Sequence, residues 1–121
     1  MVNNLIETRK VSSLTINSFV RTQLNLDRVV FLANLMEAGT ELDSIEITQD
    51  GRVVDGRHRI EAHNILDKTD IRCVVTRLTE EIDIIARAYQ ANLGSALPPT
   101  REDTEHTIQQ LIERGVQHRK L

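Results

Sequence analysis

Much of the fold can be predicted from one run of the chain, DGRVVDGRHRIEAHNIL at residues 50–66. The Asp50-Gly51 pair is a strong hairpin signal, because both residue types tolerate the left-handed backbone of a tight turn. The two valines that follow predict a short return strand, paired with an alternating apolar strand at 45–47. Gly56 allows a second sharp turn, and the remaining residues predict a short helix. The centre of the predicted fold is therefore a hairpin that leads directly into a helix.

Three cationic or potentially cationic side chains, Arg57, His58 and Arg59, occupy the first turn of that helix. Positive charge at this end opposes the helix dipole and costs about 0.3–1 kcal/mol for each group. The arrangement becomes favourable if an anion docks there, because guanidinium groups and first-turn N–H groups both suit phosphate oxygens. In the alternative interpretation the arginines are solvated, Arg57 pairs with Glu61, and His58 lies at the core edge beside Ala62. The residues by themselves leave both interpretations open.

Asp55 stands directly ahead of the glycine and could cap the helix, pair with an arginine or bind a metal. Its position favours capping. No metal site is predicted, because the chain has a single cysteine and its histidines lack ligand spacing.

Apolar spacing and capping residues predict the other elements. Strands are expected at 11–16 and 71–78, the second of them buried on both faces. Helices are expected at 27–38, 79–92 and 100–115. The order of elements predicts a small mixed domain of the α+β class.

The C-terminal part reads as an arm attached to that domain. We predict a domain at 1–93, a linker at 94–99 and a helical arm at 100–121. Thr100 and Asp103 have the spacing of a capping box at the start of the arm. Asp27 and Thr79 are the expected N-caps of the earlier helices. The expected buried stripe of the arm is Ile108, Leu111 and Ile112, and Gly115 is its expected end.

Composition narrows the class of protein. A hydrophobic content of 40% is ordinary for a globular domain, and no run approaches the ~20 apolar residues of a membrane helix. The lone Cys73 is typical of the reducing cytoplasm, where we expect the protein to reside. The net charge of −3 argues against DNA binding by overall charge, and the aromatic content of 2% argues against a base-stacking surface.

A family resemblance lies in the run at 50–66 together with the strand IRCVVTRL at 71–78. These segments resemble the signature of the ParB N-terminal domain / sulfiredoxin superfamily, in which a hairpin ends in a glycine-containing motif ahead of a helix. Downstream, YQANLGSALPPTREDTEHTIQQLIERG is similar to the ParB segment that leads to a helix-turn-helix in regulators of plasmids, phages and mobile elements. The resemblance implies a small mixed sheet flanked by helices, with a C-terminal helical arm.

The resemblance also implies a site. In ParB proteins the motif after the hairpin contacts a nucleotide triphosphate, and CTP binding with slow hydrolysis closes a dimeric DNA clamp. The corresponding phosphate-binding positions here are Asp55, Gly56, Arg57, His58, Arg59, Arg21 and Asn92. CTP or ATP, with Mg²⁺, is the implied ligand. Arg21 has an alternative interpretation as a solvated loop cation.

The chain departs from the family at two positions. ParB proteins generally have glutamate where Arg57 and Ala91 stand, and sulfiredoxins have their catalytic cysteine at the position of Arg57. The resemblance therefore implies nucleotide binding with at most weak hydrolysis, no assigned catalytic residue and no sulfiredoxin activity.

The expected function is that of a nucleotide-binding ParB-like domain in a DNA-binding partition or transcriptional regulatory protein. We expect a homodimer that contacts DNA through a segment beyond Leu121. Two alternatives stay open at this point: a phosphotransferase or nuclease on the same fold, and a degenerate protein-interaction or dimerisation module.

Overall fold

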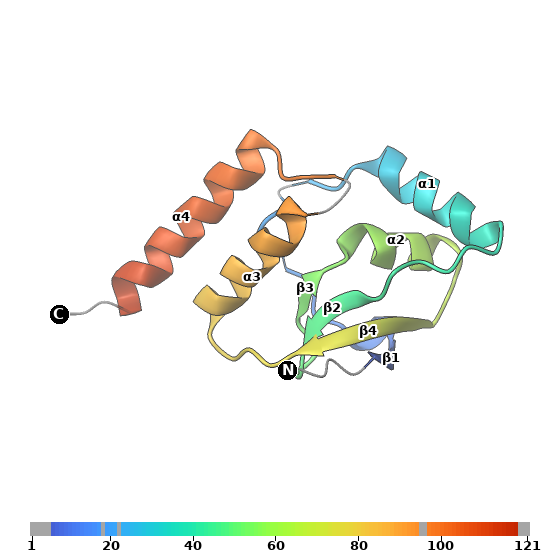
Figure 1. Cartoon of the computed structure of the whole chain (residues 1–121), viewed down its shortest axis with the longest axis horizontal. Coiled ribbons are helices and arrows are strands. Elements are labelled where there is room, and N and C mark those ends of the chain that lie inside the picture. Colours follow the sequence, from blue (N-terminus) through green and yellow to red (C-terminus); the bar gives the residue numbers. More distant parts are fainter. Residues whose placement is uncertain (1–5, 18, 22, 95–96, 119–121) are drawn as a thin grey trace. The chain divides into compact units, whose positions relative to one another are not determined.

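The computed structural model describes residues 6–17, 19–21, 23–94 and 97–118. The chain, drawn in Figure 1, divides into two compact units. The first unit combines residues 1–16 with 24–77, and the second combines 17–23 with 78–121. The division of the chain into a domain, a linker and an arm stays a prediction.

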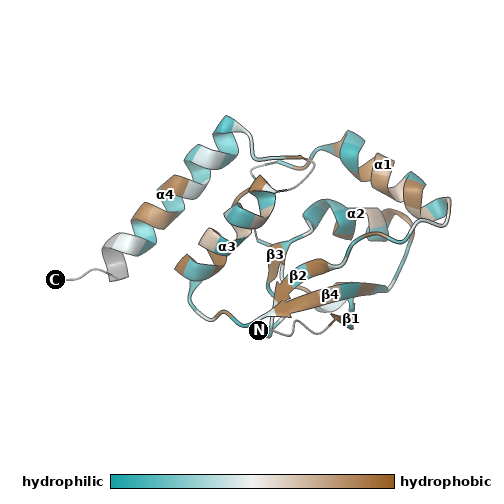
Figure 2. Cartoon of the chain, viewed as in Figure 1, coloured by the Kyte–Doolittle hydropathy of each residue, from teal (hydrophilic) through white to brown (hydrophobic). Residues whose placement is uncertain are grey.

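A mixed sheet is the base of the first unit. Its strands are β1 (Ile6–Lys10), β2 (Ile45–Thr48), β3 (Val53–Asp55) and β4 (Asp70–Thr76), in the spatial order β1-β4-β2-β3. β4 runs antiparallel to β1 and parallel to β2. β2 pairs antiparallel with β3 across a turn in which Gly51 has a φ of 86°. The predicted hairpin is confirmed, and Figure 2 shows apolar residues along its strands and along β4.

Two helices complete the first unit, α1 (Leu26–Glu37) and α2 (Arg57–Ile65). Ile60 of α2 is fully buried in a core cluster with Ile45 and Cys73 of the sheet. Ala62, two positions later, is fully buried in a different cluster with residues of α1. Two helical positions are about 200° apart, so these faces of α2 are nearly opposite. α2 therefore lies between the sheet and α1, as Figure 1 shows.

The second unit contains α3 (Glu81–Leu93) and α4 (Arg101–His118). α3 buries Ile84, Ile85 and Ala88. The predicted capping box at the start of α4 is present: Thr100 N donates to Asp103 Oδ2 at 3.0 Å, and Asp103 N donates to Thr100 Oγ1 at 3.1 Å. Reciprocal bonds of this kind satisfy N–H groups that have no partner within the helix.

The strand predicted at 11–16 is wrong. The chain forms β1 earlier, at Ile6–Lys10, and Val11–Ser13 is a short 3-10 helix. Val11 and Leu14 both pack against the core of the sheet, and three residues complete one 3-10 turn. Only an isolated bridge between Thr15 and Arg52 remains of the predicted strand within the described residues.

Burial on both faces of β4 is incomplete: in the central Cys-Val-Val run Cys73 is buried, whereas Val74 and Val75 are half-buried. Ile71 and Cys73 are buried, whereas Arg72 between them is exposed. Successive strand residues point to opposite faces of a sheet. Ile71 and Cys73 share the core cluster with Ile60 of α2, so Arg72 points to the other face.

The helices exist as predicted, but two of their caps differ. Asn25 caps α1, since its side chain accepts from Arg28 N at 3.0 Å, and Asp27 lies inside the first turn. Glu80 precedes α3 without a side-chain capping bond, where Thr79 was the expected cap.

The buried face of α4 is not the predicted one. Ile108 and Ile112 are 50% and 59% exposed, whereas Asp103 and Thr107 are 3% and 1% exposed. The buried polar groups are satisfied: Thr107 Oγ1 donates to Asp103 O at 2.8 Å. α4 also continues through Gly115 to His118. A glycine inside a helix costs only about 1 kcal/mol, which packing can offset.

Within the described residues, no helix is both long enough and apolar enough to cross a membrane.

Candidate site at the start of α2

The hairpin positions Gly56 at the N-cap of α2 with a φ of 129°. Residues that carry a side chain rarely adopt this backbone conformation, and neighbouring atoms already occupy the space that a Cβ would need. A Cβ at this position would lie 2.6 Å from Cβ of Ile45 and 3.3 Å from its Cα. Glycine therefore lets the helix start directly against the beginning of β2, as the sequence predicted for a sharp turn.

Asp55 and Arg59 form an ion pair across this turn. Arg59 Nη2 donates to Asp55 Oδ2 at 3.0 Å, and the two side chains are 19% and 25% exposed. The Nη1 atom of Arg59 donates to the main-chain oxygens of Asp43 at 3.1 Å and Ser44 at 2.8 Å. Three roles were considered for Asp55 from the sequence: capping the helix, pairing with an arginine and binding a metal. The structure shows the second of these, the pair with an arginine. The N-cap residue itself, Gly56, makes no side-chain capping bond.

His58 joins the starts of the two helices of the first unit. Its Nε2 accepts from the main-chain N of Asn25 at 3.0 Å, and Asn25 is the N-cap of α1. A ring nitrogen that accepts a hydrogen bond carries no proton, so the neutral ring has its hydrogen on Nδ1. The first turns of α1 and α2 therefore lie beside each other, and His58 is half-buried between them.

Arg57 is half-buried in the first turn of α2. The first intrahelical bond of α2 starts only at Ile60, whose N donates to Gly56 O at 2.9 Å. The N–H groups of the first turn are oriented toward the same end of the helix as Gly56, which is the end where anions are favoured. Glu61, the predicted partner of Arg57, accepts from Asn64 Nδ2 at 3.3 Å.

Arg21 belongs to the second unit and is buried there, so the alternative interpretation of a solvated loop cation is wrong. Its side chain is 8% exposed and pairs with Asp103, with 3.4 Å between Nη1 and Oδ2. Nη1 also donates to Pro98 O at 3.2 Å, and Nη2 donates to Leu97 O. Arg21 thus ties residues 17–23 to the start of α4.

Asn92 also belongs to the second unit and lies near the end of α3. It is 7% exposed, and its Nδ2 donates to Ala88 O at 2.7 Å, one turn back along the helix. Ala91, the preceding residue, has only a methyl side chain, so it offers no ligand atom. A role for Arg21 or Asn92 in phosphate binding stays a prediction.

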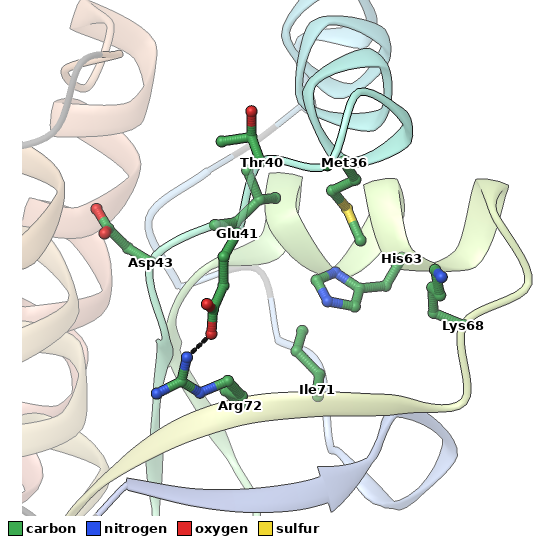
Figure 3. A pocket seen from close by; sticks show the side chains of 10 residues that line it. Met36, Thr40, Glu41, Asp43, His63, Lys68, Ile71 and Arg72 are labelled. Carbon is green, nitrogen blue, oxygen red and sulfur yellow. Dashed lines mark ion pairs between the residues drawn. The ribbon is translucent and has the colours of Figure 1, made fainter.

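The first unit has a cavity that sequence reasoning missed. It has a volume of about 280 Å³ and lies at the C-terminal ends of α1 and α2 (Figure 3). His63 Nδ1 donates to Arg59 O at 2.6 Å, which orients the ring between Met36 and Ile71. Glu41 and Arg72 form an ion pair at the opposite wall. Because its lining comes from separate segments, no local sequence signal could have identified this cavity.

Two further groups bear on chemistry. Cys73 is fully buried in the sheet, and burial raises the pKa of its thiol, so the reactive thiolate is disfavoured. Among the described residues, no three His, Cys, Asp or Glu side chains gather in a way that could hold a metal ion.

No protein-family model and no curated protein matches this chain. Solved structures do match. The N domain of a pNOB8-like ParB has a TM-score of 0.71 at 12% identity, and the alignment covers 96% of this chain and 48% of that one. A second structure of that domain has a TM-score of 0.69 at 13% identity and covers 95% and 44% of the two chains. This chain thus spans about half the length of those two relatives.

Two other solved structures extend the comparison. The C-terminally truncated chromosome-partitioning protein ParB from Caulobacter crescentus, complexed with CTP-gamma-S, has a TM-score of 0.66 at 15% identity and covers 85% of this chain and 70% of that one. Sulfiredoxin from Arabidopsis thaliana has a TM-score of 0.54 at 21% identity and covers 64% and 90% of the two chains. The mixed sheet, the helices beside it and α4 all agree with this likeness, and the chain shares the α+β fold of these ParB N domains and of sulfiredoxin.

Proposed function

We propose that this chain is a nucleotide-binding ParB-like domain and that it acts within a DNA-binding partition or transcriptional regulatory protein. The observation that carries the proposal is the likeness to a ParB solved with CTP-gamma-S, which extends over 85% of this chain. The start of α2 supports it, because a positive-φ glycine, a histidine and two arginines meet there at a helix N-terminus. Each of these features favours an oxyanion.

The triphosphate would be held by the first turn of α2. The first-turn N–H groups would donate to the phosphates, Arg57 would supply positive charge, and His58 would supply a hydrogen bond from its protonated ring nitrogen. CTP or ATP would bring Mg²⁺ with it, because ions of this kind are commonly bound through substrate phosphates with few protein ligands. The methyl side chain of Ala91 supplies no carboxylate, so we propose binding with at most weak hydrolysis.

Thermal unfolding with and without nucleotide tests the proposal. With CTP or ATP plus Mg²⁺ at about 100 times the dissociation constant, a site specific to the folded state adds about 2.7 kcal/mol, or roughly 10 °C for a domain of this size. We expect the shift to be lost in a His58→Ala variant and kept in His106→Ala, where the histidine lies on α4. An absence of any shift with CTP, ATP or inorganic triphosphate would refute nucleotide binding.

We also propose that the protein acts as a homodimer and that its contact with DNA is made outside these 121 residues. The net charge of −3 disfavours binding to DNA by these 121 residues alone, so we propose that a further segment reads DNA. A gel-shift assay of this chain with duplex DNA at about 0.15 M salt should show no complex, with or without CTP. A complex under these conditions would place DNA recognition within this chain instead.

A further inference from the structure

We infer that Arg59 is a positioning residue of the proposed phosphate site: it holds the first turn of α2 against the start of β2 and does not itself contact phosphate. This inference rests on the nucleotide binding proposed above and refines it. Its place in the first turn of the helix suggests an anion contact for Arg59, and the family resemblance places it among the phosphate ligands. Its hydrogen bonds instead join the guanidinium to the main chain ahead of β2 and to Asp55.

The guanidinium of Arg59 is directed at the main chain ahead of β2 and at the carboxylate of Asp55. Both N–H groups of Nη1 have acceptors, the main-chain oxygens of Asp43 and Ser44. Nη2 donates to Asp55 on the strand that precedes the helix. A planar guanidinium has a fixed set of donor directions, so it cannot turn toward a phosphate without giving up these bonds.

The three acceptors lie where the helix and the sheet meet. Asp43 and Ser44 directly precede Ile45, the residue against which Gly56 packs. The close approach at Gly56 and the bonds of Arg59 therefore fix the same junction from two sides. The main-chain oxygen of Arg59 also accepts from His63, so the residue is held at its backbone as well as at its side chain.

Charge gives a second reason. The carboxylate of Asp55 lies 3.0 Å from Nη2 and is 25% exposed. It neutralises much of the field of Arg59 and would repel a phosphate brought to the same guanidinium. We therefore assign the contact with an anion at this helix end to Arg57 and the first-turn N–H groups, and Arg59 determines where they stand.

The effects of three variants on CTP affinity, measured by calorimetry with Mg²⁺, separate positioning from direct contact. If Arg59 positions the turn, Asp55→Ala weakens binding, because the guanidinium loses an anchor. If Arg59 contacts phosphate, Asp55→Ala strengthens binding, because a repulsive carboxylate is gone. Arg59→Lys keeps the charge but loses the fork, so we expect a loss of roughly 10- to 100-fold, the range typical of residues that orient another ligand. Arg57→Lys, in the same turn, is the matched control and should lose less than Arg59→Lys.

Amide hydrogen exchange in the absence of nucleotide gives an independent readout. The N–H of Ile60 makes the first intrahelical bond of α2, to Gly56 O at 2.9 Å. We expect Arg59→Lys to accelerate exchange at Ile60 and across residues 43–46, and Arg57→Lys to leave both unchanged. All variants are compared at a temperature at which their circular dichroism shows full folding, so a lost fold cannot account for lost binding.

The outcomes distinguish the inference from the proposal beneath it. Tighter CTP binding in Asp55→Ala, or unchanged exchange and near-normal affinity in Arg59→Lys, overturns the positioning role while nucleotide binding stands. If the unmodified chain binds none of CTP, ATP and inorganic triphosphate, the proposed function fails. The role of Arg59 in positioning a phosphate site then fails as well. Weaker binding in both Asp55→Ala and Arg59→Lys together with faster exchange supports the inference.

Discussion

At the scale of single residues, Gly56 is the position with the least freedom to change. It combines a φ of 129° with a predicted Cβ contact of 2.6 Å to Ile45. We expect Gly56→Ala to lower the free energy of unfolding by about 3 kcal/mol, the sum of backbone strain and overpacking. Gly39→Ala is the control, because Gly39 has a φ of 92° but nothing within 4 Å of its missing Cβ. That variant should cost only about 1–2 kcal/mol in urea unfolding. Equal costs for the two variants would show that the contact with Ile45 contributes nothing.

Cys73 gives a second prediction at this scale. Burial raises the pKa of its thiol in the folded chain. A group whose folded pKa is raised contributes stability below its unfolded pKa, and that contribution is lost as pH rises toward the folded value. We therefore expect the unfolding free energy to fall above about pH 8.5, and Cys73→Ala to show a smaller decrease over the same range. A thiol reagent should label Cys73 only after urea unfolding, and rapid labelling of the folded chain would contradict its burial.

At the scale of elements, α4 is held by polar contacts at its start. Asp103 accepts from Thr100 N and pairs with the buried Arg21, whose other acceptors are Leu97 O and Pro98 O. The apolar Ile108 and Ile112 of the same helix are at least half exposed. The start of α4 is therefore fixed by its cap and by its buried ion pair.

A double-mutant cycle tests this account. Arg21→Met and Asp103→Ala should each cost about 3–5 kcal/mol of unfolding free energy, because either change leaves a buried charge without its partner. The double variant should cost clearly less than the sum. The control cycle uses Arg101 and Glu105 on the same helix, whose side chains are 93% and 66% exposed and should couple by only about 0.3–0.5 kcal/mol. Additive effects at Arg21 and Asp103 would show that the pair does not hold the helix.

At the scale of the whole molecule, α4 packs within the second unit together with α3. Residues 17–23 precede α1 in the chain, yet they group with α3 and α4. Thr107 of α4 donates to Phe19 O at 3.4 Å, and the guanidinium of Arg114 lies 5.4 Å from the Phe19 ring centre. These contacts give the arm a structural role within its unit.

Shortening the chain tests the predicted domain boundary at residue 93. A chain that ends at Leu93 lacks the acceptors of Arg21 at Leu97, Pro98 and Asp103. We expect its α3 amides to exchange quickly with solvent, while β2 and β4 in the first unit retain protection. A chain that ends at His118 keeps these contacts and should match the full chain. Protected α3 amides in the shorter chain would support residues 1–93 as a self-sufficient domain.

The sequence by itself determined the hairpin at 45–55, the start of α2 at Gly56 and the capping box of α4. Each of these depends on interactions between residues a few positions apart, such as turn chemistry, capping and alternating apolar spacing, and such signals are visible in a linear sequence. The cluster of cations at 57–59 was visible for the same reason.

Only the tertiary structure decided what those cations contact. Arg59 reaches carbonyls 15 and 16 positions earlier, and Arg21 pairs with a carboxylate 82 positions later. The cavity beside His63 likewise depends on segments that are distant in the sequence. Partners of this kind are set by how whole elements pack, because a guanidinium can donate to a carbonyl, a carboxylate or a phosphate, and packing decides which of them comes within reach.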